Sequence, residues 1–126
     1  RDDNHGVYGN LTIPFSLGVG AGHRFWMSGA YGLHPVRNPV PLWVGTGVVS
    51  QGLLGSRPLD LLLVGFSWSQ FSLDDWSQRE RLLEMEYSIV LTDTIILQPN
   101  IQWYLSEEGT TNSGPIVAGL GIHFGL

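Results

Sequence analysis

The sequence predicts an all-β protein, built as an antiparallel up-and-down meander of about seven long strands. The main observation is a strict alternation of apolar and polar residues on both sides of a short turn in residues 80–105. No stretch repeats its apolar residues at a helical period between capping residues. Hydrophobic residues make up 43% of the chain and charged residues only 13%, against about 25% in soluble domains. Alternating strands with one face in lipid explain this composition, so we expect part of a transmembrane β-barrel.

The hairpin at residues 80–105 shows the alternation most clearly. Its turn lies at residues 91–94, which include Asp93, a usual turn residue. One face of each strand is apolar, and the other face carries carboxylate, hydroxyl and amide groups: Glu84, Glu86, Ser88, Gln98, Asn100 and Gln102. Strands of about ten residues are long for a globular domain, where about five or six is usual, but they suit a bilayer crossing.

The remaining strands follow from the same alternation, each bounded by residues typical of turns. We expect them at residues 6–17, 23–33, 42–52, 60–71 and 114–126. Pro14 lacks a backbone donor and marks an edge, a bulge or an end. The up-and-down order places the turns at 18–22, 53–59 and 92–94 at one end of the sheet, and the loops at 34–41, 72–79 and 106–113 at the other. Most of these turns are shorter than the loops, as expected of periplasmic turns.

Several kinds of chemistry are not expected. The chain has no cysteine, and its four histidines lack zinc-site spacing, so we expect no metal and no cofactor. The net charge of −5 argues against a nucleic-acid partner.

Glu84 and Glu86 would lie about 6.5–7 Å apart on a strand, which overlaps the range for inverting glycosidases. Such enzymes normally bring their acids from opposite sides of the substrate, so we expect two water-facing carboxylates and no enzyme.

The candidate pore-lining residues are side chains on the faces expected to point inward. They are Arg24, Trp26, Glu84, Glu86, Ser88, Gln98, Asn100, Gln102 and His123. The tryptophans admit two interpretations, as aromatic girdles at the membrane interfaces or as flat surfaces on which a solute stacks. We favour the girdle for Trp68 and Trp103, which are expected to face outward. Trp26 and Trp43, expected to face inward, are the better stacking candidates.

Two motifs in a fixed order suggest a family. The first is G-x-x-x-x-R-P-x-D at residues 52–60, and the second is L-Q-P-N-x-Q at residues 97–102. Together they resemble the carbohydrate-selective outer-membrane porins of the OprB type, from about Gly6 onward. The resemblance implies a barrel of about 16 strands in the cell outer membrane that passes sugars by diffusion. Within the first motif, we expect Arg57 to pin a turn through Asp60 rather than to meet solute.

The chain begins at Arg1 rather than Met and shows no signal peptide, so we expect residues 1–126 to be a mature C-terminal fragment of one outer-membrane porin domain. The partners that the resemblance implies are small sugars or other small hydrophilic solutes, outer-membrane lipid, and the barrel-assembly machinery at the C-terminal strand. Two alternatives stay open. The alternation does not say which face is inside, so a soluble lipocalin-like barrel with a small apolar ligand is possible. The second alternative is a non-conducting outer-membrane barrel.

Overall fold

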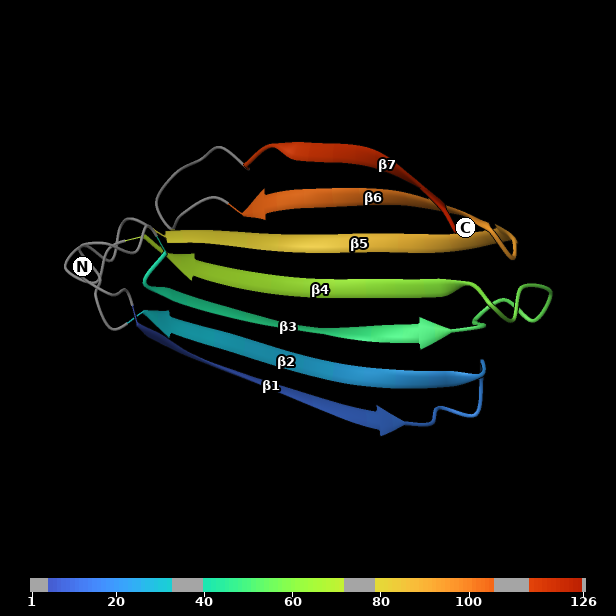
Figure 1. The fold of residues 1–126 in the computed structure, drawn as a ribbon, viewed down its shortest axis with the longest axis horizontal. Helices are drawn as coiled ribbons and strands as arrows, with labels where there is room; N and C mark the ends of the chain where they lie inside the picture. Colours follow the sequence, from blue (N-terminus) through green and yellow to red (C-terminus); the bar gives the residue numbers. More distant parts are fainter. Residues whose placement is uncertain (1–4, 33–39, 72–78, 106–113, 126) are drawn as a thin grey trace.

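The computed structural model describes residues 5–32, 40–71, 79–105 and 114–125. These residues form one antiparallel sheet whose strand order follows the sequence, as Figure 1 shows. The strands are β1 (Gly6–Phe15), β2 (Gly22–Gly32), β3 (Leu42–Gln51), β4 (Leu61–Gln70), β5 (Arg79–Thr92), β6 (Ile95–Leu105) and β7 (Ile116–Phe124). The expected seven-stranded meander is therefore confirmed. In the described part of the chain, no helix has the length and apolarity needed to cross a membrane.

The strand pairing keeps like residues in register across the sheet. One cross-strand row is apolar from edge to edge and consists of Ile13, Phe25, Val48, Val64, Met85, Ile101 and Ala118. A neighbouring row points to the other face and consists of Thr12, Trp26, Gly47, Gly65, Glu84, Gln102 and Val117. Because side chains alternate along each strand, these two rows define an apolar face and a polar face of the sheet.

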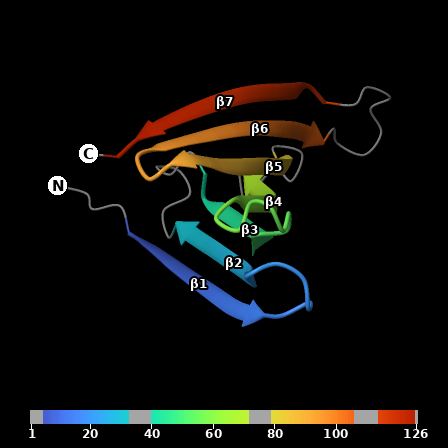
Figure 2. The ribbon, with the colours of Figure 1, turned by 90° about the vertical axis from the view of Figure 1, so that its right-hand side faces the viewer.

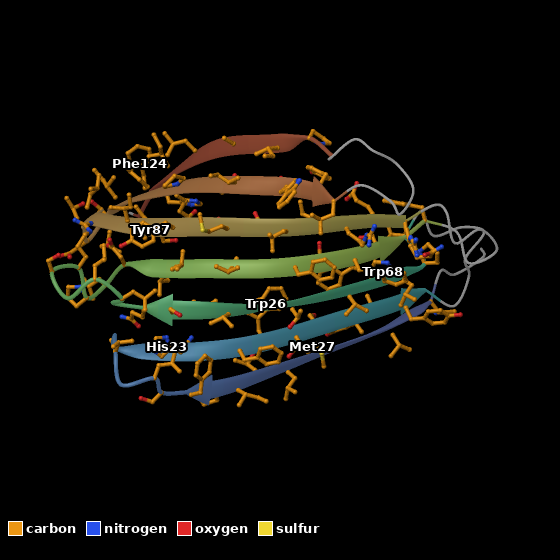
Figure 3. All side chains as sticks on the ribbon, turned by 180° about the vertical axis from the view of Figure 1, so that it is seen from behind. His23, Trp26, Met27, Trp68, Tyr87 and Phe124 are labelled. Atoms are coloured by element: carbon orange, nitrogen blue, oxygen red, sulfur yellow. The ribbon has the colours of Figure 1, made fainter. Side chains whose placement is uncertain are left out.

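The sheet is curved, with β1 and β7 at its two edges (Figure 2). Side chains crowd together on a concave surface and splay apart on a convex one. Large side chains of the apolar face are well exposed, with Met85 at 48% and Ile122 at 52%, whereas Glu84 and Glu86 are half-buried. We therefore assign the apolar face to the convex side. Figure 3, a view of the sheet from behind, labels three side chains that belong to the apolar face: Met27, Trp68 and Phe124.

Nothing within the described residues covers this apolar face. No hydrophobic side chain among them is buried, because the sheet is a single layer. A continuous exposed apolar band is unusual for a soluble surface and is the pattern of a barrel wall in lipid.

The strand ends agree with the expected turns, with small shifts in the boundaries. β1 ends at Phe15, two residues before the expected end, and Pro14 lies in this edge strand as a proline should. The β5–β6 turn lies at Asp93 and Thr94, and an irregularity in pairing between Val90 and Thr92 precedes it. β5 and β6 are therefore joined by a tight turn of two residues.

The turn between β3 and β4 is fastened to β5 by four residues, which we call the Asp60 cluster: Arg57, Asp60, Tyr87 and Val90. The Asp60 side chain is only 3% exposed. Its carboxylate accepts hydrogen bonds from the Arg57 guanidinium, from the Tyr87 hydroxyl at 3.0 Å and from the Val90 backbone N–H at 3.0 Å. Arg57 Nη2 also donates to the Val90 carbonyl at 3.0 Å. The expected Arg57–Asp60 pair is confirmed, and it holds the turn to a strand that lies far along the sequence.

The Arg57 guanidinium is the main reason why the pKa of Asp60 is lowered, and the hydrogen bonds from Val90 and Tyr87 act in the same direction. Burial opposes them, because it disfavours the charged carboxylate. The same pair raises the pKa of Arg57. The cluster therefore favours ionised Asp60.

A second buried link joins β2 to β3 and to the preceding turn. His23 Nε2 lies 2.7 Å from the Val19 carbonyl oxygen, and His23 Nδ1 lies 2.9 Å from Ser50 Oγ. The carbonyl can only accept, so Nε2 donates to it, and in the neutral imidazole Nδ1 accepts from the Ser50 hydroxyl. The ring also stacks on Phe15 with centroids 5.3 Å apart. His23 therefore has a structural role at this end of the sheet.

Candidate functional site

All nine candidate pore-lining residues lie on the polar face of the sheet. Arg24 and Trp26 come from β2, and His123 comes from β7. The other six come from β5 and β6, the two strands of the hairpin that the sequence predicted at residues 80–105. The register thus gathers residues that are up to 99 positions apart in sequence, as for Arg24 and His123, onto one surface.

Five of these residues form two hydrogen-bonded groups, Glu84 with Gln102 and Glu86 with Ser88 and Gln98, which together we call the carboxylate–amide network. The Gln102 amide donates to Glu84 Oε1 at 3.0 Å. The Gln98 amide donates to Glu86 Oε1 at 3.2 Å and to Ser88 Oγ at 2.9 Å. Each amide also has a carbonyl oxygen, and each carboxylate has further lone pairs. The network therefore presents both donors and acceptors, which is the pattern needed to exchange hydrogen bonds with hydroxyl groups.

Three other candidates lie on the same face but outside this network. The amide of Asn100 lies over Gly119 of β7, where an added Cβ would be 2.8 Å from Asn100 Oδ1. His123 lies near Gly121 on the same strand, with Nε2 3.5 Å from the position of an added Cβ. Arg24 shares a cross-strand row with Glu86, three strand spacings away, or about 14 Å. The polar face therefore carries a cation on one side and carboxylates on the other.

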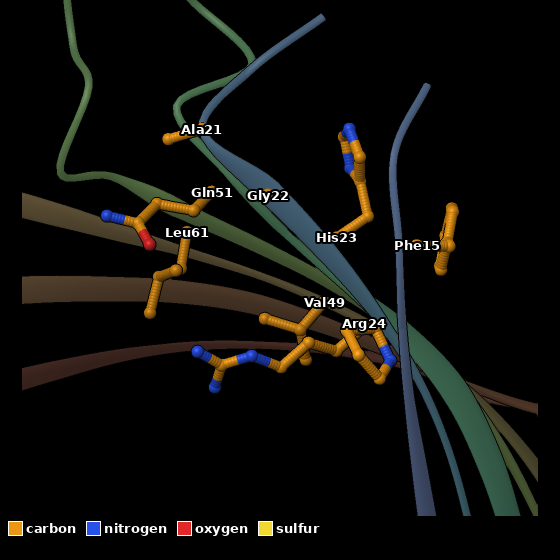
Figure 4. A pocket seen from close by; sticks show the side chains of 9 residues that line it. Phe15, Ala21, Gly22, His23, Arg24, Val49, Gln51 and Leu61 are labelled. Carbon is orange, nitrogen blue, oxygen red and sulfur yellow. The ribbon is translucent and has the colours of Figure 1, made fainter. Parts of the chain in front are cut away.

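Figure 4 shows the surroundings of Arg24. His23 and Arg24 are neighbours in sequence but point to opposite sides of the sheet, and Arg24 extends on the side of Val49 and Leu61. A cavity of about 440 Å³ lies at this end of β2 and is lined by residues that include Arg24 and Gln51. The guanidinium group is exposed, so it is available to solutes at this end of the sheet.

The half of the polar face formed by β2, β3 and β4 is less polar than the half formed by β5 and β6. Trp26 and Trp43 lie there, beside a cavity of about 170 Å³ whose lining also includes Leu63, Leu82 and Glu84. Trp43, expected to face inward, lies over Gly45 of its own strand. Gly47 and Gly65, for which the sequence predicted no role, occupy the same cross-strand row as Trp26. Alternation places both glycines on the inward face, but only the register of β2, β3 and β4 brings them into this row.

The two tryptophans expected to face outward do so. Trp68 is four residues from Val64 and Trp103 is two residues from Ile101, so alternation places both on the apolar face. Both lie toward the end of the sheet opposite the Asp60 cluster. This position is that of residues in an aromatic girdle. Trp76, His34 and Arg37 lie outside the described residues.

The residues that the structure describes include no group of three or more His, Asp or Glu side chains placed to hold a metal ion. The sequence also has two pairs of adjacent acidic residues, at 74–75 and 107–108, and both pairs lie outside the described residues.

Long antiparallel strands with one exposed apolar face and one hydrogen-bonding face define a sheet of the outer-membrane β-barrel class. The sequence model of OprB, the carbohydrate-selective porin family, matches residues 16–126. The chain therefore belongs to the OprB family of carbohydrate-selective porins, as the two motifs indicated. Neither the curated proteins nor the solved structures gave a match.

Proposed function

We propose that the chain forms part of the wall of a water-filled channel through which small sugars diffuse passively across the cell outer membrane. The observation that carries this proposal is the pairing of two opposite surfaces on one sheet. The convex apolar face suits hydrocarbon, and the concave face presents the carboxylate–amide network. A soluble lipocalin-like barrel would need the reverse arrangement, with its apolar residues enclosed.

The described strands alone do not close a cylinder. β1 and β7 each pair on one side only within the described residues, so each leaves a row of backbone donors and acceptors. In a bilayer such groups must be satisfied by further strands. We propose that residues 1–126 are the C-terminal part of one larger porin barrel, and that the remaining strands complete the channel.

The channel mechanism requires weak and repeated binding. A solute hydroxyl can replace water on a Gln amide or on a carboxylate of the network at little net cost, because hydrogen bonds are exchanged rather than gained. Such exchange allows a solute to enter and also to leave. This mechanism includes no covalent step and no cofactor, so Glu84 and Glu86 act as acceptors and fixed charges.

Conductance of the full-length protein in planar lipid bilayers tests the proposal directly. We expect stepwise channel openings and, in liposome-swelling assays, entry of monosaccharides. The double variant Glu84→Gln with Glu86→Gln should shift the zero-current potential in a salt gradient toward lower cation preference, because carboxylates on a pore wall favour cations. Asp93→Asn, in the exposed β5–β6 turn, is the matched control and should leave this potential unchanged. A correctly folded protein in lipid that shows no conductance and no sugar entry would indicate a non-conducting barrel instead.

A further inference from the structure

We propose that Trp26 and Glu84 form a stacking subsite that binds one pyranose ring, and that this subsite distinguishes cyclic sugars from acyclic polyols. The inference rests on the proposed channel function, because it assigns a binding position on the polar face. The argument depends on the orientation of the Trp26 indole, its place in a cross-strand row, and the chemistry of the groups beside it.

The Trp26 indole lies flat on the sheet, over a floor of three glycines. Atoms from both of its rings approach the floor. Nε1 lies 2.9 Å from the position of an added Cβ at Gly47, Cζ2 lies 3.3 Å from that at Gly65, and Cζ3 lies 3.2 Å from that at Gly45. A ring standing on edge would not bring atoms of both rings close to three separate backbone positions. One π-face is therefore turned to the backbone and the other to the concave side.

The row continues from this floor to the carboxylate–amide network. Gly65 pairs with Glu84, and Glu84 pairs with Gln102. Trp26 and Glu84 are three strand spacings apart at the backbone, about 14 Å, and the indole extends over the two intervening strands. Both residues line the same cavity of about 170 Å³. A flat aromatic surface, the Trp26 indole, and a hydrogen-bonding group, the Glu84 carboxylate, therefore lie side by side in one site.

These two surfaces match the two surfaces of a pyranose. The C–H bonds of a pyranose ring in its chair form make an apolar face, and its hydroxyl groups project around the rim. The C–H face can lie on the exposed indole face while rim hydroxyls donate to the free lone pairs of Glu84 and accept from amide N–H groups. Sites of this kind combine an aromatic surface with a few placed polar groups that fix orientation.

An acyclic polyol has similar hydroxyl groups but no rigid C–H face. It would have to lose the freedom of several rotatable bonds to lie flat on the indole, and this ordering reduces its affinity. The nearby apolar side chains of Leu63 and Leu82 also favour a solute with an apolar face. The subsite should therefore distinguish a cyclic sugar from an acyclic polyol even when the two have nearly the same size and number of hydroxyl groups.

The experiment measures block of ion current by sugar through the full-length protein in planar bilayers. D-glucose is compared with D-sorbitol, an acyclic polyol with the same number of carbon atoms. The wild-type channel should be half-blocked at a lower concentration of glucose than of sorbitol. Trp26→Leu should raise the half-blocking concentration of glucose about three- to tenfold, the range for loss of one aromatic contact, and leave that of sorbitol and the open conductance unchanged.

Three further variants separate stacking from general effects. Trp103→Leu makes the same chemical change on the apolar face and should alter neither half-blocking concentration. Trp26→Phe keeps a ring that can lie on the glycines and should retain part of the preference for glucose. Gly65→Val keeps Trp26 but fills the space under its indole, so it should weaken glucose block.

Equal half-blocking concentrations of glucose and sorbitol in the wild type would overturn the subsite, and so would a Trp26→Leu channel that binds glucose as before. A protein that never conducts would contradict the channel instead. The subsite would then be tested by titrating glucose and sorbitol against tryptophan fluorescence in detergent micelles, in wild type and Trp26→Leu. A glucose response that requires Trp26 would support the subsite, and its absence would overturn it.

Discussion

Removing the Asp60 carboxylate should strongly destabilise the protein. In Asp60→Ala, the Val90 N–H and the Tyr87 hydroxyl each lose the acceptor that lies 3.0 Å away. A hydrogen bond to a charged group contributes about 1.5–3 kcal/mol, and an orphaned buried donor costs about 1–3 kcal/mol. The Arg57 pair adds little, because the Arg57 side chain is 38% exposed and solvent screens it.

We therefore expect Asp60→Ala to lower the free energy of unfolding by about 3 kcal/mol. Urea titration of the full-length protein in lipid vesicles, followed by tryptophan fluorescence, measures this difference. Asp60→Asn keeps one acceptor oxygen and should cost roughly half as much. Asp93→Ala, which also removes an aspartate from a turn but from an exposed site, should stay within about 0.5 kcal/mol of wild type. Equal effects of Asp60→Ala and Asp93→Ala would refute the reasoning.

The same cluster predicts a pH dependence whose sign follows from the lowered pKa of Asp60. A carboxylate with a lower pKa in the folded state contributes stability that is fully present above its unfolded value, about 3.9. The contribution is lost as the pH falls through the folded-state pKa. The difference in stability between wild type and Asp60→Asn should therefore be constant at neutral pH and shrink below about pH 4. A difference that grew under acid would contradict the ionised state of Asp60.

Two other predictions test the face assignment and the packing of the strands. Met85→Arg, on the apolar face, should cost about 2–4 kcal/mol of unfolding free energy in vesicles, whereas Glu86→Arg on the polar face should cost much less. Gly47→Ala should impair folding, since its Cβ would clash with the Val64 carbonyl oxygen, while a Cβ at Gly9 would have nothing within 4 Å, so Gly9→Ala should be tolerated. Heat-modifiable gel mobility reports folding of the Gly variants, and similar mobility for both would argue against the described packing.

The alternation of residues predicted the strands and their faces well, because a strand places neighbouring side chains on opposite sides whatever its partners are. Each side chain of the carboxylate–amide network could therefore be assigned to the polar face from sequence alone. The Arg57–Asp60 pair could also be predicted, since the two residues are three positions apart in one turn. These predictions need only local geometry.

Features that depend on register could not be predicted in the same way. The partners of Asp60 on β5 are 27 and 30 residues away, and only the pairing of β4 with β5 brings them together. The glycine floor under Trp26 likewise requires the register of β2, β3 and β4. The irregularity between Val90 and Thr92 is a third such feature, because an extra residue in a strand leaves no clear trace in an alternating pattern.

The first motif, at residues 52–60, gains a physical explanation from the structure. Gly52 has a φ of 63°, a conformation that side chains disfavour, and Arg57 and Asp60 form the central pair of the Asp60 cluster. Residues of this first motif thus shape and fasten the β3–β4 turn.

The order of the strands also has a consequence for how the sheet is assembled. Within the described sheet, each strand pairs only with its neighbours in the chain, so none of these pairings has to wait for a distant segment to arrive. Closing short loops loses little chain entropy, and topologies dominated by such local pairings fold faster than those that need long-range ones. The sheet can therefore form one hairpin at a time, and each completed hairpin provides the edge strand with which the next strand pairs.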